Sequence, residues 1–304
     1  MCITKRKGKT MKLYAPKYYQ KFKCIADRCT HSCCVGWEID IDERTLEKYK
    51  KLSGGYSDAI RESISTDGAP HFKLGARERC PHLDERGLCR IIMNVGEEYL
   101  CDICREHPRF YNFTDVCEVG VGMSCPAAAR IILESEDYDE ILEIGEVDAQ
   151  ADSVDFDGRA ERGVIYEILR ERDISYGHRL EKIYDRYAIC AGDDAHWREA
   201  LDGLEYLDAK HKALFMSYSA SRRPVGADGY LERFFAYFIY RHATEAFDIE
   251  EFRERLSFCL FCERLLASLI CSEGVKSQAE IEKLASIISE ELEYSEDNTY
   301  ALMR

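Results

Sequence analysis

Cysteine is the residue type whose number and spacing could support chemistry in this chain. Four cysteines lie within eleven residues, at Cys24, Cys29, Cys33 and Cys34. Six more follow before residue 126, at Cys80, Cys89, Cys101, Cys104, Cys117 and Cys125. Ten of the fifteen cysteines thus lie between residues 24 and 125, whereas cysteines that serve only as small core residues would be scattered. Thiolates bind zinc and iron–sulfur clusters strongly, so this region predicts a metal or iron–sulfur centre.

Chain length and the N-terminus argue against a disulfide framework. A chain of 304 residues can bury a sizeable core, enough for two domains, without covalent staples. No apolar stretch of a secretory signal follows the basic residues 1–10, and no apolar run is long enough to span a bilayer. We therefore expect a cytoplasmic protein, in which thiols stay reduced and clustered cysteines serve metal or redox chemistry.

The local spacing fits neither of two common metal motifs. Cys29 and Cys33 match the first half of a Cys-x3-Cys-x2-Cys triad, but Gly36 stands where the third cysteine would be. The spacing of this first cluster is also not C-x2-C with a matching second pair, the pattern of a zinc ribbon. Spacing alone leaves a [4Fe–4S] cluster and a zinc ion as alternatives.

The charge balance bears on the choice of partner. The chain has 57 acidic and 42 basic residues, a net charge of -15, so its overall field repels nucleic acid and anionic membranes. The same field attracts a basic partner or a protein surface that carries lysines. We expect no nucleic-acid partner.

The segments around the first cysteines predict short elements. Residues 13–24 predict a helix that packs three aromatic side chains inward, those of Tyr14, Tyr18 and Phe22. From Trp37 to Asp42, apolar and acidic residues alternate with a period of two, which predicts a half-buried strand. Asp42 would then cap a helix over residues 43–52.

The later cysteines flank a predicted turn and lie on a predicted helix. A tight turn around residues 85–87 would bring Cys80 and Cys89 together across a hairpin. Cys101 and Cys104 are three residues apart and would share one face of a short helix that Pro108 terminates.

The rest of the chain predicts a hairpin and then a helical bundle. A hairpin over residues 109–122 leads to Pro126, which suits the first turn of a helix. Residues 134–157 contain eleven acids and no Lys or Arg, typical of an exposed connector, although residues 139–149 could form an edge strand. Beyond residue 160, apolar residues recur at helical spacing. The predicted fold is mainly α with a small β-containing, cysteine-rich N-terminal metal-binding region (1–135), an acidic connector (136–160) and a helical domain (161–304).

Four ordered segments resemble one known family. They read FKCIADRCTHSCCVGWEID, CPHLDERGLCRI, GEEYLCDICREHPR and MSCPAAAR, and they span roughly residues 12–135. This pattern resembles the flagellin lysine N-methylase family, which is related to small CxxCxxCC putative iron- or zinc-chelating proteins. The resemblance implies methyl transfer from S-adenosylmethionine to surface lysines of flagellin in the bacterial cytoplasm, with a [4Fe–4S] cluster held by the cysteine-rich motif.

The resemblance also selects residues. It implies a set of metal ligands among Cys24, Cys29, Cys33, Cys34, Cys80, Cys89, Cys104 and Cys125. Cys101 stands where the family pattern has a serine-like residue, and His107 replaces a tyrosine, so the role of Cys101 stays open. We expect the remaining thiols to be core or surface groups, namely Cys2, Cys190, Cys259, Cys262 and Cys271.

Neither the catalytic residues nor the binding site for S-adenosylmethionine can be assigned from the sequence. Gly120 and Gly122 follow a predicted strand, but a lone G-x-G is weak evidence for a nucleotide site, and we expect these glycines to let the backbone pass close to the cluster. Aromatic residues that could wall a lysine channel are more simply core residues; they are Trp37, Tyr99, Phe110 and Tyr111. His31 and His82 lie beside the clusters, where hydrogen bonding is a simpler role than ligation.

Two other function classes stay open. One is a zinc- or iron-binding scaffold with no catalytic activity, and the other is a redox or metal-delivery protein. The broad apolar faces of the later helices also leave a homo-oligomer or a peripheral membrane association open, although a bundle core explains them with fewer assumptions.

Overall fold

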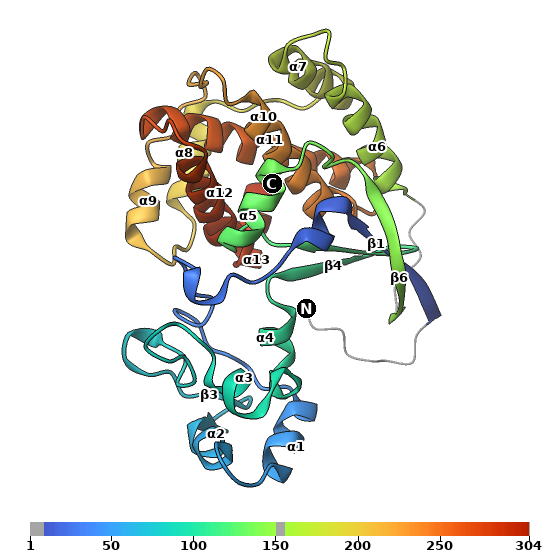
Figure 1. Ribbon diagram of the computed structural model, residues 1–304. Helices are drawn as coiled ribbons and strands as arrows, with labels where there is room; N and C mark the ends of the chain where they lie inside the picture. The colour runs from blue at the N-terminus through green and yellow to red at the C-terminus, as the bar shows by residue number, and fades with distance from the viewer. Residues whose placement is uncertain (1–8, 150–155, 304) are drawn as a thin grey trace. The chain divides into compact units, whose positions relative to one another are not determined.

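The computed structural model describes residues 9–149 and 156–303, and the chain divides into two units (Figure 1). The cysteine-rich unit is Lys23–Arg109. The helical unit comprises, within the described residues, 9–22, 110–149 and 156–303. The cysteine-rich unit is therefore inserted in the sequence between two parts of the helical unit. These boundaries differ from the expected ones, because the predicted hairpin and the helix after Pro126 belong with the later helices.

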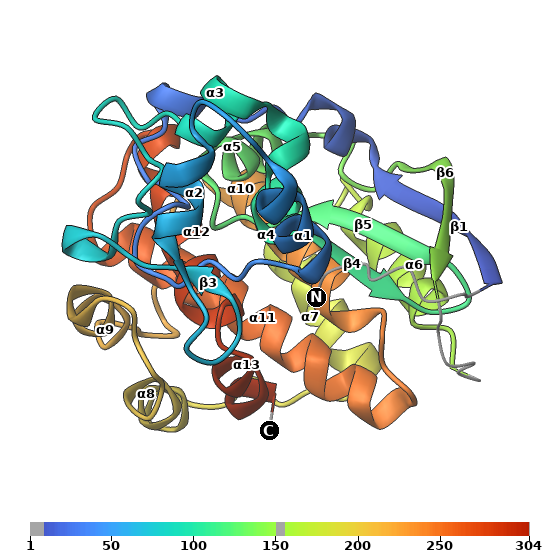
Figure 2. The same cartoon turned by 90° about the horizontal axis from the view of Figure 1, so that it is seen from below.

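A four-stranded mixed sheet in the order β4-β5-β1-β6 opens the helical unit. Its strands are β1 (Lys9–Pro16), β4 (Arg109–Phe113), β5 (Cys117–Val121) and β6 (Ile141–Ala149). In Figure 2, β1 lies between β5 and β6; it runs parallel to β5 and antiparallel to β6, from Lys9 opposite Ala149 to Pro16 opposite Ile141. The predicted edge strand within the acidic segment is thus confirmed, while residues 150–155 of that segment lie outside the described part.

Helices make up most of the helical unit. They are α5 (Pro126–Glu134), α6 (Gly158–Leu169), α7 (Tyr176–Tyr187), α8 (Asp194–Asp202), α9 (Ala209–Phe215), α10 (Asp228–Phe238), α11 (Ile249–Ser272), α12 (Gln278–Glu293) and α13 (Glu296–Met303). A short 3-10 helix, Lys17–Lys21, follows β1, and a π-helical turn, Ile239–Ala243, extends α10. Helix α11 packs against α10 and α12, and buried residues lie all around its central turns. A helix that is apolar on every side belongs at the centre of a core.

Buried ion pairs connect these helices. The guanidinium of Arg162 binds the carboxylate of Glu118 at 2.7 Å, and both side chains are almost fully buried. Three further carboxylates are buried and paired in the same way, in the pairs Arg179–Glu232, Arg223–Glu263 and Arg241–Glu293. Removal of one member of such a pair leaves a buried charge without compensation, so each pair restricts how the helices can pack.

Short elements and loops form the cysteine-rich unit. Its helices are α1 (Glu43–Lys51), α2 (Ser57–Ser63), α3 (Arg90–Val95) and α4 (Asp102–Glu106), and its strands are β2 (Ile64–Ser65) and β3 (His71–Phe72). Three 3-10 turns complete it, at Ala26–Arg28, Ala76–Glu78 and Glu97–Tyr99. Its small core includes Ile39, Ile41, Tyr49, Phe72 and two cysteines, Cys80 and Cys101.

Several local predictions are confirmed. The Asp42 side chain accepts a hydrogen bond from the backbone N–H of Thr45 at 2.9 Å and caps α1. Strands β4 and β5 are adjacent and form the predicted hairpin, and Pro126 occupies the first turn of α5. The chain is mainly helical, as predicted.

Other local predictions are wrong. Residues 13–24 form the end of β1, a 3-10 turn and a short irregular stretch instead of a helix, because β1 pairs with strands on both sides. The segment from Trp37 to Asp42 buries Ile39 and Ile41 as its alternation predicts, but it forms an isolated bridge instead of a strand. No helix in the described ranges combines the length and apolarity needed to cross a bilayer.

Candidate metal centre

Two distant loops bring Cys34 and Cys80 side by side. The backbone N–H of Cys80 donates to the carbonyl of Cys34 at 2.8 Å, and Val35 pairs with Arg79 in an antiparallel bridge. The turn before Cys80 is strained, because Arg77 and Glu78 both have left-handed backbone angles, with φ of 60° and 55°. A strained backbone of this kind persists only where its surroundings fix it, here through the N–H of Gly36, which donates to the Glu78 carbonyl.

A tight turn returns the chain from Cys80 to Cys89. The N–H of Asp84 donates to the Leu88 carbonyl at 2.8 Å, and Gly87 has the positive φ of 82° that this turn needs. Leu83 and Cys89 pair in an antiparallel bridge. The predicted turn is therefore confirmed, and Cys89 lies at the start of α3.

Cys101 and Cys104 lie together at the start of α4. Their thiols share a hydrogen bond, as their predicted placement on one helical face implies. The hydroxyl of Tyr49 donates to the Tyr99 carbonyl at 2.6 Å and lies 3.6 Å from the sulfur of Cys101. Helix α1 thus positions the α4 thiols from the other side of the small core.

The ionisation of these five cysteines is mutually linked. Burial, together with the charges that Cys34, Cys89 and Cys101 carry when ionised, raises the pKa of Cys80 to about 12. The hydrogen bond to Cys101 raises the pKa of Cys104, and burial and the charges of the other thiolates add to this rise. We call Cys34, Cys80, Cys89, Cys101 and Cys104 the thiol group. A cation among these sulfurs would remove the repulsion between thiolates and favour their ionised forms.

Cys34 differs from the buried members of the thiol group. A hydrogen bond with Cys33 lowers the pKa of Cys34 to about 7, although burial opposes the shift. A thiol with this pKa is substantially ionised at neutral pH and is therefore the more reactive nucleophile or ligand. The adjacent cysteines thus divide their roles, with Cys33 supporting the ionised form of Cys34.

The other predicted ligands lie elsewhere. Cys24 is exposed and its sulfur accepts from the N–H of Ala26, and the Cys29 thiol donates to the His31 carbonyl at 2.7 Å. Cys125 belongs to the helical unit and precedes α5. All the cysteines in the described part of the chain are free thiols.

The thiol group has the donor chemistry of a metal centre without the geometry of one. Several thiolates suit zinc and iron–sulfur clusters. Across residues 9–149 and 156–303, however, no three side chains of the His, Cys, Asp and Glu types converge in an arrangement that could hold a metal ion. Cys101 and Cys104 instead hydrogen-bond to each other, and the thiols of Cys80 and Cys89 interact with backbone N–H groups. Ligation would therefore require these side chains to turn toward a common point. The ligand set thus stays a prediction.

The histidine and glycine predictions have different outcomes. Both ring nitrogens of buried His82 are hydrogen-bonded, to Tyr56 at 3.0 Å and to Ser63 at 2.8 Å, and burial lowers the pKa of His82 to about 4. His82 is therefore a hydrogen-bonding core residue, as the simpler expectation had it.

The prediction that glycine makes room for a cluster is wrong at Gly120, since the ring of Phe110 fills the space beside its Cα.

Two residues of the site were missed or left open by the sequence. Tyr49 showed only the spacing of a core residue, and no motif marks its hydroxyl as a neighbour of a thiol. The role of Cys101 was left open because this residue departs from the family pattern. In the structure Cys101 is fully buried and its thiol shares a hydrogen bond with that of Cys104. Among the aromatic candidates, Phe110 packs edge-on against Tyr237 and Tyr240 in the helical core, so it is a core residue.

Comparison with known proteins gives three similar sequences. The flagellar biosynthetic protein FliU of Salmonella muenchen is 28% identical over 134 residues, which are 40% of this chain and 77% of that protein. Proteins named lysine-N-methylase from Salmonella typhimurium and Salmonella choleraesuis are each 27% identical over 132 residues. The chain is related to the flagellin lysine N-methylases.

This relationship to the lysine N-methylases covers only part of each sequence. The match takes in 40% of this chain but 32% of each lysine-N-methylase, so the chain spans about a third of their length. No family model matches the chain, and no solved structure matches it. The recognised family is thus supported by sequence similarity over a limited stretch.

Proposed function

We propose that this chain is a protein-lysine N-methyltransferase that transfers a methyl group from S-adenosylmethionine to lysines of flagellin and depends on a thiolate-bound iron–sulfur cluster. The observation that carries the proposal is the similarity to proteins named lysine-N-methylase and FliU. The thiol group supports the cluster, because it gathers five soft donors from four separate segments of the chain.

The reaction sets requirements on the protein. A carbon–nitrogen bond forms to the lysine amine, the sulfur–carbon bond of the donor breaks, S-adenosylhomocysteine leaves, and the amine loses one proton. The lysine must be neutral before attack. An apolar wall lowers the pKa of its amine, and a nearby proton acceptor or solvent takes up the proton.

The residues of the cysteine-rich unit have definable tasks in this proposal. Cys34, Cys80, Cys89 and Cys104 would hold a bound cluster, which would supply an iron centre for the donor, and Cys101 would be a ligand or a hydrogen-bond partner. Tyr49 fixes the position of Cys101 through its own bond to the Tyr99 carbonyl. Cys34 loses its proton near neutral pH and is therefore ready to ligate.

The test is a methyl-transfer assay under anaerobic conditions. Protein reconstituted with iron and sulfide is incubated with flagellin and with donor labelled in its methyl group. We expect labelled lysines by mass spectrometry, none in flagellin whose lysines are replaced by arginine, and at least a hundredfold loss of rate in the double variant Cys80→Ser/Cys104→Ser. The matched control Cys271→Ser, in α11, should keep its rate. Absence of labelled lysine with cluster-loaded protein would refute the enzyme.

A structural zinc or iron scaffold is the second candidate. It is favoured by the burial of Cys80 and Cys101 in the small core, where a metal would mainly hold irregular backbone together. Such a protein would bind metal stoichiometrically, would lose the fold of the cysteine-rich unit with a chelator, and would transfer no methyl group.

A further inference from the structure

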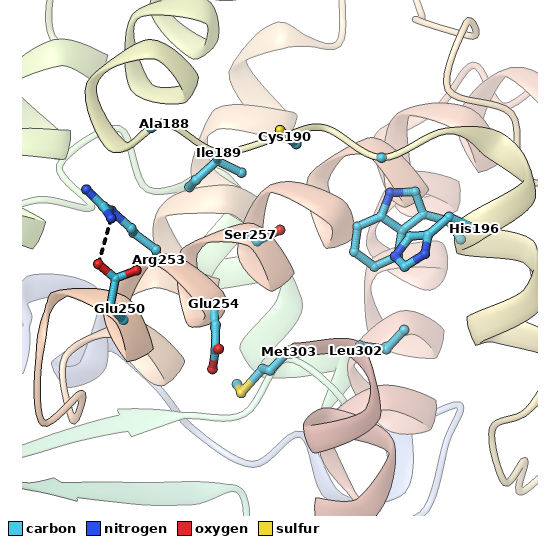
Figure 3. A pocket seen from close by; sticks show the side chains of 12 residues that line it. Ala188, Ile189, Cys190, His196, Glu250, Arg253, Glu254, Ser257, Leu302 and Met303 are labelled. Atoms are coloured by element: carbon cyan, nitrogen blue, oxygen red, sulfur yellow. Dashed lines mark hydrogen bonds and ion pairs between the residues drawn. The ribbon is translucent and has the colours of Figure 1, made fainter.

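A surface cavity of about 470 Å³ lies in the helical unit, within one group of helices (Figure 3). Its walls come from the segment after α7, from the first turns of α11 and from the end of α13. Ala188 ends α7 in the left-handed region, with φ of 52°, and sends the chain across the cavity as a strap over residues 189–193. The volume is in the range of sites for small ligands.

Aromatic packing fixes one wall of this cavity. The indole of Trp197 stacks on Phe261 with ring centroids 3.9 Å apart, and its N–H donates to the Ala191 carbonyl at 2.9 Å. Gly192 has a φ of 65°, and a Cβ there would lie 2.5 Å from the indole nitrogen. The strap therefore rests directly on Trp197. Because Phe261 covers one indole face and His196 packs edge-on at 4.8 Å, this wall offers an apolar edge and no aromatic cage.

One of the two carboxylates in the cavity lining takes no part in an ion pair within the described residues. Glu250 and Arg253 form an ion pair at 2.8 Å, which cancels both charges. Glu254 is exposed and makes no ion pair within the described residues. In Figure 3 its carboxylate extends toward Met303, apart from the Glu250–Arg253 pair. Glu250, Arg253 and Glu254 together give the lining a net charge of about -1, which favours a cation and disfavours a phosphate or carboxylate ligand.

Apolar side chains line the same cavity. Leu302 and Met303 lie at the end of α13 and are nearly buried, and Ile189 of the strap lines the same space. An extended aliphatic chain that ends in an ammonium group matches this arrangement, because its methylenes contact apolar surface while the charge meets a carboxylate.

We propose that this cavity binds a lysine side chain of a protein substrate, with Glu254 receiving the ammonium group. The cation preference stands on the cavity itself, whereas the assignment of the lysine to a methyl-accepting substrate rests on the proposed function. Glu254 is a binding residue in this proposal, and no step of the chemistry is assigned to it.

The two tryptophans of the chain allow a direct test. Protein labelled with 5-fluorotryptophan gives two fluorine NMR signals, from Trp197 in the cavity wall and from Trp37 in the cysteine-rich unit. The variant Trp37→Phe lacks the Trp37 signal and so identifies the signal of Trp197. The probe is Nα-acetyl-lysine N-methylamide, and the same molecule acetylated on its side-chain nitrogen is the neutral control. We expect a saturable shift of the Trp197 signal with the lysine probe, an unchanged Trp37 signal, and at least fivefold weaker binding of the neutral control.

Matched variants test the role of Glu254. Glu254→Gln should weaken the lysine probe at least fivefold, and Glu254→Asp should weaken it less. Glu273→Gln, an exposed acid at the other end of α11, should change it less than twofold. No saturable shift, equal binding of the neutral probe, or an unaffected Glu254→Gln variant would each overturn the proposal.

The same variants separate this inference from the enzyme proposal. If flagellin is methylated, Glu254→Gln should raise KM for flagellin at least fivefold with little change in kcat, and an unchanged KM would overturn the assignment to substrate lysine. If flagellin is not methylated but the probe binds through Glu254, the lysine site stands and the methyltransferase proposal fails.

Discussion

The two units of this protein solve the problem of a stable core in different ways. The helical unit buries long helices and several complete ion pairs, whereas the cysteine-rich unit has short elements and a core in which two cysteines take the place of larger apolar residues. A unit of the second kind gains little from packing alone, and bound metal can supply the missing stability. The contrast teaches that thiols contribute to the small core itself, so that in the proposed function they would serve both structure and chemistry.

The largest expected effect concerns the buried carboxylate of Glu293. It binds Arg241 at 3.0 Å and His242 at 2.6 Å. Glu293→Ala leaves these groups uncompensated and should destabilise the helical unit by about 3–5 kcal/mol, measured by urea denaturation followed by circular dichroism. The exposed control Glu273→Ala should stay within about 0.5 kcal/mol. A small loss in Glu293→Ala would mean that the ion pairs are not what distinguishes the two units.

Close packing in the helical unit gives the next effect. The ring of Phe110 fills the space beside Gly120, so Gly120→Val should destabilise by about 2–3 kcal/mol through overpacking. Gly163 in α6 has open space around it, and Gly163→Ala should stabilise by about 0.5–1 kcal/mol. If Phe110→Ala does not rescue Gly120→Val in thermal unfolding, the destabilisation has another source.

Metal removal should act on the cysteine-rich unit alone. Chelation of anaerobically loaded protein should raise the rate of proteolytic cleavage within Lys23–Arg109 at least tenfold, a change of about 1.4 kcal/mol in the opening equilibrium. Cleavage within the helical unit should change less than twofold. Mass spectrometry of timed digests measures both rates, and equal acceleration in the two units would remove the proposed difference between them.

The smallest effect depends on pH and again concerns the helical unit. Burial raises the pKa of Glu245, whose carboxylate accepts a hydrogen bond from the N–H of Phe113 at 2.8 Å. Because the folded state holds this proton more tightly than the unfolded chain, the contribution to stability is greatest below the unfolded pKa and is lost as pH rises through the folded pKa.

Replacement of Glu245 isolates that contribution. Glu245→Gln keeps an acceptor for Phe113 without the charge, so it should stabilise by less than about 1 kcal/mol at pH 7 and by nothing near pH 4. Urea denaturation at both pH values measures this, and a gain that is independent of pH would rule out the titration as its cause.

Local chemistry could be predicted from the sequence more reliably than long-range pairing. The cap at Asp42, the turn before Cys89 and the thiol pair on α4 depend on residues a few positions apart, and all three were predicted. The segment after residue 12 was wrongly predicted as a helix because its conformation is set by strand partners more than a hundred residues later. The domain boundaries depended on the same distant pairing.

The candidate site could be predicted in composition but not in arrangement. Four members of the thiol group were named from the family resemblance, but whether Cys24, Cys29 or Cys125 joins them depends on loop and unit positions that no local pattern encodes. The contact between Tyr49 and Cys101 could not be predicted for the same reason, since it joins residues that are far apart in the sequence. The surface cavity of the helical unit gave no sequence signal, because its walls come from three separate segments.

The insertion of Lys23–Arg109 between β1 and β4 has a consequence for biosynthesis. Strand β1 is made first, but its partners β5 and β6 leave the ribosome only after the whole cysteine-rich unit has been synthesised. The nascent thiols are therefore complete and accessible while the sheet is still open. If the proposed function holds, iron or zinc would reach them during translation, before the helices of the C-terminal half exist.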